Sequence, residues 1–141
     1  MIVNAFYSST YVTEMVFYGN GETLSTSTLF TLSGAPIQFY SSQFLNFVSS
    51  KATSVISLEN AGSFYMINCQ IINTEVSAVP NFITLLNVER VLIFDNVFIL
   101  PGHIATVTRT SPYIHANIII TDSITNIFNI ENSENTFITL N

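Results

Sequence analysis

Short apolar runs separated by polar turns recur along this chain with a long period. The stretch from Leu58 to Ile72 contains the end of one apolar run, a turn at Asn60, a second apolar run, a polar bend and a third apolar pair. The same plan returns 27 positions later, from Leu85 to Ile99, and begins again at Ile130. Self-similarity at a period of roughly 20–50 residues is typical of solenoids, in which each repeat buries its apolar side by stacking on its neighbours.

Each unit is predicted to hold two or three short strands. In successive units the first apolar run ends at Leu32, Leu58, Leu85, Val107 and Ile130. The central run begins at Ile37, Phe64, Val91, Tyr113 and Thr136, so the first two steps are equal and the last two are shorter. A competing register aligns residues 91–95 with 118–122, but the interval that it leaves between Ile118 and Thr136 is short for a full coil. We therefore prefer the first register.

This pattern predicts an all-β fold, a parallel β-helix of about five coils of 22–33 residues. The coils are expected at roughly residues 1–28, 29–54, 55–81, 82–104 and 105–126, with a partial coil at 127–141. We expect this single segment to be part of a longer protein or assembly. A β-sandwich with a turn roughly every 8 to 12 residues is the competing fold. It does not predict motifs that repeat at long range.

Composition favours strands and narrows the classes of partner. Apolar residues make up 48% of the chain and charged residues only 9%, against a usual charged share of about 25%. Twelve Phe and six Tyr favour strands over helices. The net charge of −6, with only three basic residues, argues against nucleic acid and against electrostatic docking on anionic lipid. No apolar run is long enough to span a bilayer.

The repeat resembles a known group of proteins. Residues 64–71, with their echo at 91–98, look like the coils of right-handed parallel β-helices of the pectin-lyase-like superfamily. They are most similar to the Asn-rich versions in large surface proteins of protists and bacteria. The resemblance covers about residues 37–141. It implies a right-handed coil, a location outside the cell or on its surface, and ladders of Asn at the turns. The turn residues that would form this structural ladder are Asn60, Asn87 and Asn132, while Gly34 and Arg109 interrupt it.

The central strands are apolar at both alternating positions, so an apolar column is expected outside whichever side faces the core. A sheet with one wet face should instead alternate between apolar and polar residues. Exposed apolar patches usually mark an interface. The side chains expected to form this interface are Tyr40, Tyr65, Ile67, Leu92 and Phe94. The last strand, residues 136–141, carries no charged residue that would block pairing. We therefore expect either that the natural protein continues or that another chain stacks there.

Candidate catalytic groups are few. Asp95 and Asp122 are the only aspartates, and paired carboxylates are what glycoside hydrolases use. In the preferred register the two occupy different places in their coils, so Asp95 is better interpreted as a polar bend residue. A calcium-dependent lyase would need more acidic ligands than this chain clusters. His103, His115 and Cys69 are interpreted as loop, strand and bend residues, and we expect no catalytic residue, metal site or cofactor.

The function expected from these patterns is that of a non-enzymatic structural or adhesive segment. Its partners would be other protein chains, or copies of itself, that meet the apolar flank and the open ends of the coil, and end-to-end stacking would give a filament. The alternative is a carbohydrate-binding or carbohydrate-cleaving β-helix, acting as a polysaccharide lyase or glycoside hydrolase if it is an enzyme. It would use Asp95 and Asp122 as carboxylates, and its sugar-stacking aromatics would be Tyr7, Tyr40, Tyr65 and Phe94.

Overall fold

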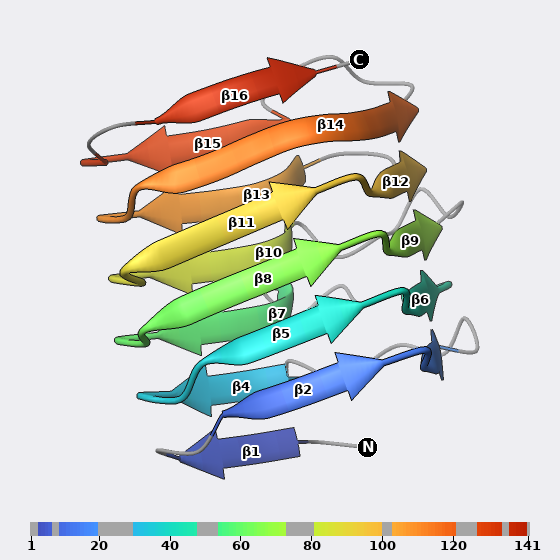
Figure 1. Cartoon of the computed structure of the whole chain (residues 1–141), viewed down its shortest axis with the longest axis horizontal. Helices are drawn as coiled ribbons and strands as arrows, with labels where there is room; N and C mark the ends of the chain where they lie inside the picture. Colours follow the sequence, from blue (N-terminus) through green and yellow to red (C-terminus); the bar gives the residue numbers. More distant parts are fainter. Residues whose placement is uncertain are drawn as a thin grey trace.

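The computed structural model describes residues 3–6, 9–19, 30–47, 54–72, 81–99, 103–120, 127–133 and 136–140. Within these ranges every regular element is a β-strand, and every pairing between strands is parallel. The strands stack into a β-solenoid with three faces, which Figure 1 shows from the front.

Each face is a stack of strands from successive rungs. The back face consists of β1 (Val3–Phe6), β4 (Phe30–Ser33), β7 (Ser54–Glu59), β10 (Asn81–Leu86), β13 (His103–Thr108) and β15 (Phe128–Glu131). The front face consists of β2 (Thr10–Thr13), β5 (Ile37–Tyr40), β8 (Ser63–Ile67), β11 (Arg90–Phe94), the first half of β14 (Pro112–Ile120), and β16 (Phe137–Leu140). The short face consists of β3 (Val16–Tyr18), β6 (Gln43–Leu45), β9 (Gln70–Ile72), β12 (Val97–Ile99) and the second half of β14.

The coil is right-handed. In Figure 1 the front strands run from left to right and the back strands from right to left, while the chain climbs from the N-terminus at the bottom to the C-terminus at the top. This is the hand that parallel crossovers adopt in nearly all proteins, because strands twist to the right.

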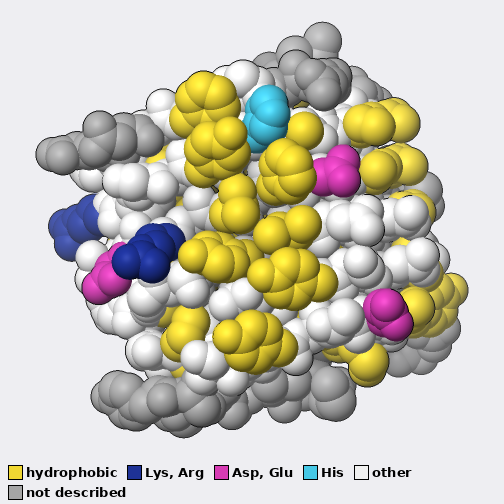
Figure 2. All heavy atoms as spheres, viewed as in Figure 1, with side chains coloured by type: hydrophobic (Ala, Val, Ile, Leu, Met, Phe, Trp, Pro, Cys, Tyr) yellow, Lys and Arg dark blue, Asp and Glu magenta, His cyan; other side chains and the backbone are white. Residues whose placement is uncertain are grey.

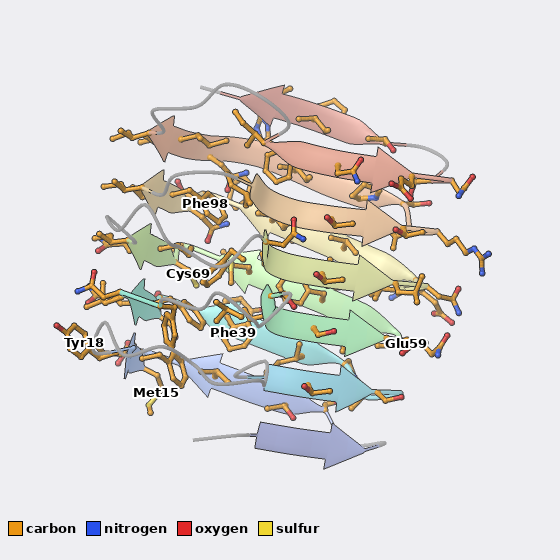
Figure 3. All side chains as sticks on the ribbon, turned by 180° about the vertical axis from the view of Figure 1, so that it is seen from behind. Met15, Tyr18, Phe39, Glu59, Cys69 and Phe98 are labelled. Carbon is orange, nitrogen blue, oxygen red and sulfur yellow. The ribbon has the colours of Figure 1, made fainter. Side chains whose placement is uncertain are left out.

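The core is built from the inward side chains of all three faces. Strand residues alternate between the two sides of a sheet, and here one set points into the coil. Figure 3 shows Phe39, Cys69 and Phe98 among the stacked strands. The largest fully buried side chains are Phe39, Phe44, Phe64, Phe98, Ile37, Ile56, Leu58, Met66, Ile71 and Ile83. Phe44 lies edge-on to both Phe39 and Phe82, with ring centroids 5.3 and 5.4 Å apart.

Two corners of the coil are held by residues with left-handed backbone. The corner between the back and front faces has positive φ at Gly34, Asn60, Asn87, Arg109 and Asn132. The bend between the front and short faces has positive φ at Glu14, Ser41, Asn68, Asp95 and Ala116. Most of these backbone N–H groups donate to a carbonyl of the next rung, as Asn60 N does to Leu86 O at 3.0 Å. Gly and Asn tolerate this conformation best, which explains their recurrence in the turns.

The structure confirms the all-β solenoid and most of the sequence register. Leu58 pairs with Leu85, Leu85 with Val107, and Val107 with Ile130. The position predicted for the fourth central strand is wrong by one residue, because Val91 pairs with Pro112 and Leu92 with Tyr113. The competing register is wrong, since Ile118 pairs with Val97.

Candidate interaction surface

The outward side chains of the front face are mostly apolar. They form two columns, because residues that pair between parallel strands lie directly above one another. The first column is Tyr11, Gln38, Tyr65, Leu92, Tyr113 and Phe137. The second begins with Thr13 and continues with Tyr40, Ile67, Phe94 and His115. Figure 2 shows this apolar field running across the front of the molecule.

All five residues predicted for an apolar interface point outward in these columns. Tyr40, Tyr65, Ile67, Leu92 and Phe94 are each half-buried. The sequence left open which set of alternating residues faces the core. In the structure the inward set includes Phe64 and Met66, both with 0% exposure. The outward apolar residues are therefore additional to a core that is already complete.

The upper part of the front face carries a cluster of stacked rings. Tyr113 and Phe137 stack with centroids 4.9 Å apart and planes 11° from parallel. Phe94 and His115 stack at 5.8 Å and 25°, and the His115 ring nitrogen Nδ1 also meets the Thr139 hydroxyl. Each of these rings uses one of its faces for a neighbouring ring. The stacks therefore leave less open ring face for a ligand than isolated aromatics would.

The short face continues the apolar surface around the bend. Its exposed residues include Val16, Tyr18, Ile118 and Ile120, which are 58%, 61%, 50% and 55% exposed. Figure 3 shows Tyr18 reaching outward at this side of the coil. Gln43 and Gln70 lie in the same column and join through a hydrogen bond of 3.2 Å between Nε2 and Oε1. Apart from this amide pair, the outward side chains of the described short-face strands are apolar or aromatic.

The back face is different, because its outward side chains in the two columns below are polar with the exception of Leu86. One column holds Thr31, Ser57, Thr84, Thr106 and Asn129. The other holds Ser33, Glu59, Leu86, Thr108 and Glu131. Here the strands alternate between apolar inward and polar outward residues, as expected of a sheet with one wet face. In its described strands the molecule thus has one mostly polar face and two mostly apolar faces.

Charged side chains border the front face on both sides. Figure 2 shows Lys or Arg side chains to the left of the apolar field and Asp or Glu side chains to its right, with one acid beside the basic groups. Exposed Glu89, Arg90 and Arg109 belong to the corner with the back face. Exposed Glu14 and Asp95 belong to the bend with the short face.

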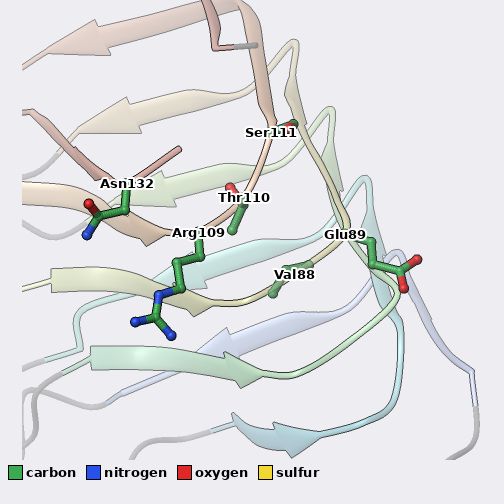
Figure 4. A pocket seen from close by; sticks show the side chains of 6 residues that line it. All are labelled: Val88, Glu89, Arg109, Thr110, Ser111 and Asn132. Atoms are coloured by element: carbon green, nitrogen blue, oxygen red, sulfur yellow. The ribbon is translucent and has the colours of Figure 1, made fainter. Parts of the chain in front are cut away.

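A shallow depression of about 410 Å³ opens at the corner between the back and front faces. Figure 4 shows the six residues that line it, Val88, Glu89, Arg109, Thr110, Ser111 and Asn132. The Arg109 guanidinium and the Glu89 carboxylate lie on opposite sides of it. The Thr110 hydroxyl is buried without a hydrogen-bond partner, so solvent does not reach it. The described residues contain no cluster of His, Cys, Asp or Glu that could hold a metal ion.

The three turn residues predicted to form an Asn ladder lie in one column at this corner. Asn60, Asn87 and Asn132 are exposed and have positive φ. The Asn87 amide donates to Asn60 Oδ1 at 2.7 Å. Arg109 occupies the rung between Asn87 and Asn132, and Gly34 occupies the rung before Asn60. The side-chain contact is thus shown for one pair of rungs.

A second polar ladder, which sequence reasoning missed, is buried at the other bend. Its members are Ser42, Cys69, Asn96 and Asn117, which are at most 1% exposed. Asn96 Oδ1 accepts from the Cys69 backbone N–H at 2.8 Å, and its Nδ2 donates to Met66 O at 2.9 Å. Asn117 Oδ1 accepts from both nitrogens of Asn96 at 3.1 and 3.0 Å. The ladder satisfies backbone groups that the bend removes from the sheets.

Cys69 belongs to this ladder and shows no sign of reactivity. Its thiol donates to Ile67 O at 3.4 Å and lies 3.6 Å from Phe39 O. Burial raises the pKa of the Cys69 thiol above its ordinary value, so the thiol stays neutral. A neutral, enclosed thiol is a poor nucleophile.

Only two of the remaining candidates, Asp95 and His115, have described side chains. Asp95 is an exposed residue with positive φ at the front bend. His115 packs on Phe94. Asp122 and Tyr7 lie outside the described residues, and of His103 only the backbone, in β13, is described. The pairing of Asp95 with Asp122 stays a prediction.

Comparisons with known proteins do not assign this chain to a family. No protein-family model, no curated protein and no solved structure matches this chain. Among the described residues there is no helix long and apolar enough to cross a membrane.

Proposed function

We propose that this chain is a non-enzymatic structural or adhesive β-solenoid segment that packs its apolar flank against another protein surface. The observation that carries the proposal is the contrast between the faces. The front and short faces present mostly apolar columns to the outside, whereas the back face presents Thr, Ser, Asn and Glu with a single Leu. Large apolar patches of this kind are typical of surfaces that a partner covers.

The size of the apolar surface supports a protein partner. With rungs about 4.8 Å apart and residues about 3.3 Å apart, the front and short faces together cover a flat area of roughly 700 Å². This is about the area that each partner contributes to a standard protein–protein interface. The net charge of −6 disfavours an anionic membrane or nucleic acid as the partner.

Carbohydrate binding is the alternative function, and the Tyr residues in the front columns favour it. Sugar recognition by stacking needs an open aromatic face. The stacked pairs Tyr113–Phe137 and Phe94–His115 instead pack ring on ring, which is how aromatics pack at protein interfaces. A glycan array separates the two ideas. Binding that is lost in Tyr65→Ala would favour the sugar-binding alternative.

We also propose that this chain is related to the pectin-lyase-like superfamily and that it is located outside the cell or on its surface. The hydrogen bond between the side chains of Asn87 and Asn60 supports this kinship, because the resemblance implies a ladder of Asn at this turn.

The proposal is tested by placing a charge on each face in turn. Leu92→Lys alters the front face, Ile120→Lys the short face, and Thr84→Lys the polar back face as the matched control. We expect the wild-type chain to associate, by sedimentation velocity, over about 5–500 μM, a range typical of modest interfaces. At least one apolar-face variant should associate less, and the control should behave as the wild type.

The contrary result is equally clear. If the wild-type chain stays monomeric and soluble throughout this range, and none of the three lysines changes its behaviour, the apolar faces do not pack on protein in the way proposed.

A further inference from the structure

We propose that the partner of the front face is a second copy of this chain. The two copies would pack front face to front face, with their solenoid axes side by side and pointing the same way. A two-fold axis parallel to the solenoid axis would relate them. This inference rests on the proposed function and adds to it the identity and the geometry of the partner.

The argument begins with strand β11, which carries opposite charges at its two ends. Arg90 is its first residue, and Asp95 follows its last residue at the front bend. Both are exposed, while Leu92 and Phe94 point outward between them. Within the described front strands, Arg90 is the only Lys, Arg, Asp or Glu. When a second copy of such an apolar strip is rotated by 180° and placed opposite the first, the positive edge of each copy can meet the negative edge of the other.

The direction of the two-fold axis decides which charges meet. A half-turn about an axis parallel to the solenoid exchanges the left and right edges of the facing copy but keeps its height. The corner of one copy then lies along the bend of the other at the same rung. Arg90 of each copy faces Asp95 of its partner, so the contact forms twice, as an isologous interface requires. Arg109, one rung above, adds a second positive charge at this corner, where the exposed Glu89 carries the opposite charge.

The opposite orientation is disfavoured by charge. A half-turn about an axis along the strands would place corner against corner and bend against bend. The bend of one copy, which carries the acids Glu14 and Asp95, would then lie along the equally acidic bend of the other copy. Like charges held together at an interface oppose association and select against that arrangement. Glu59 and Glu131 do not disturb the parallel arrangement, because they end strands of the back face.

The available area sets the expected strength. Six front strands at about 4.8 Å spacing, each about five residues long, give a flat area of roughly 500 Å² for each copy. Side-chain relief increases the accessible area, which still lies towards the small end of stable interfaces. We therefore expect a dimer with a Kd in the micromolar range, about 1–100 μM. At that strength the two symmetric charge contacts decide orientation and contribute measurably to Kd.

The test reverses each charge and then mixes the two variants. Arg90→Asp alone sets two acids against each other at both contacts, and Asp95→Arg alone sets two arginines against each other. We expect each variant alone to dimerise at least about tenfold more weakly than the wild type by sedimentation equilibrium, because rim charges at both contacts change from attraction to repulsion. An equimolar mixture should form heterodimers with a Kd within about threefold of the wild type, since both contacts regain opposite charges.

The mixture makes the experiment independent of effects on folding. Both substitutions are at exposed positions, and Arg109 shows that arginine is compatible with the positive φ at position 95. Glu59→Arg, which changes charge on the back face, is the matched control and should leave the dimer unchanged. Thermal unfolding of each variant checks that the fold is intact.

The outcomes separate this inference from the proposed function. If the charge variants and their mixture behave as the wild type while Leu92→Lys dissociates the dimer, the apolar face packs on protein but not in this two-fold arrangement. If each charge variant alone dimerises more weakly and the equimolar mixture does not regain the wild-type Kd, Arg90 of one copy does not face Asp95 of the other. A wild-type chain that stays monomeric, with no effect of Leu92→Lys, overturns both proposals.

Discussion

Inside the solenoid, single polar side chains hold the bend between the front and short faces. The Asn96 amide bonds to three groups from the two neighbouring rungs: the Cys69 backbone N–H and the Met66 carbonyl on one side, and Asn117 on the other. Buried polar groups stabilise a fold only when they are paired, and the loss of one partner leaves another group unsatisfied. Asn96 is therefore the residue at which a single change has the widest effect.

We expect Asn96→Leu to lower the free energy of unfolding by about 2–4 kcal/mol, because it leaves the Cys69 N–H and the Met66 carbonyl without their side-chain partner. Urea denaturation measures the change. Gln70→Leu is the control, since Gln70 is exposed one residue beyond Cys69, and it should shift the free energy by less than about 0.5 kcal/mol. Equal effects of the two substitutions would show that the buried ladder does not contribute specifically.

This ladder was missed in the sequence for a specific reason. The regular spacing of the repeat already places Ser42, Cys69 and Asn96 in one column. The predicted fourth central strand began at Tyr113, whereas the pairing begins at Pro112. That shift of one residue replaces Asn117 with Ile118 at the ladder position. With apolar Ile118 at that position, the sequence does not predict the buried pair of Asn96 and Asn117.

At the scale of elements, the turns fix the register of the strands. Both corners place one residue with positive φ in each described rung from β4 to β14, and the N–H groups of most of these residues bond to the rung above. Because most of these residues are not glycine, each rung stores some backbone strain. The strands between them are short, so the corners define where each strand starts and stops.

We expect Arg109→Gly to raise the free energy of unfolding by about 0.5–1 kcal/mol, because glycine adopts positive φ without a steric penalty. Arg109→Val should lower it by more than about 1 kcal/mol, since a β-branched residue is disfavoured there. Thermal or urea unfolding of the two variants provides the comparison. The explanation fails if valine and glycine at this position give equal stability, whereas Arg109→Lys should remain close to the wild type.

The repeat made the strands and their pairing predictable, because the packed elements keep one spacing through three rungs. The outward side of the front strands was not predictable, because both sets of alternating residues are apolar. Phe64 and Tyr65 are equally compatible with the core by hydrophobicity. The structure separates them through the bend, where buried Cys69 fixes the inward direction of the residues before it. The sequence therefore predicted the residues of the candidate interface, but it left open which of the two alternating sets faces the core.

At the scale of the whole molecule, the solenoid is a linear stack. Every strand pairing joins neighbouring rungs, so stability is close to a sum of rungs and the contacts between adjacent rungs. The core is nevertheless continuous, since buried side chains from several rungs form one cluster. A destabilising substitution in one rung should therefore lower the stability of the adjacent rungs most and that of distant rungs least.

We expect Phe64→Ala, which removes a ring with 0% exposure, to lower the free energy of unfolding by about 3–5 kcal/mol. Hydrogen–deuterium exchange should show the largest loss of protection in β8 and in its partners β5 and β11. Strand β15 should change much less. A uniform loss of protection across all described strands would mean that the chain unfolds as one cooperative unit instead.

The linear stack also makes length an adjustable property. One full repeat, such as the segment 64–90, begins and ends at equivalent positions, since Phe64 pairs with Val91. Duplicating it would lengthen the rod by about 4.8 Å while extending each of its surfaces by one more row. The length of the solenoid can therefore change in fixed increments, while the side chains displayed on each of its faces keep the same chemical character.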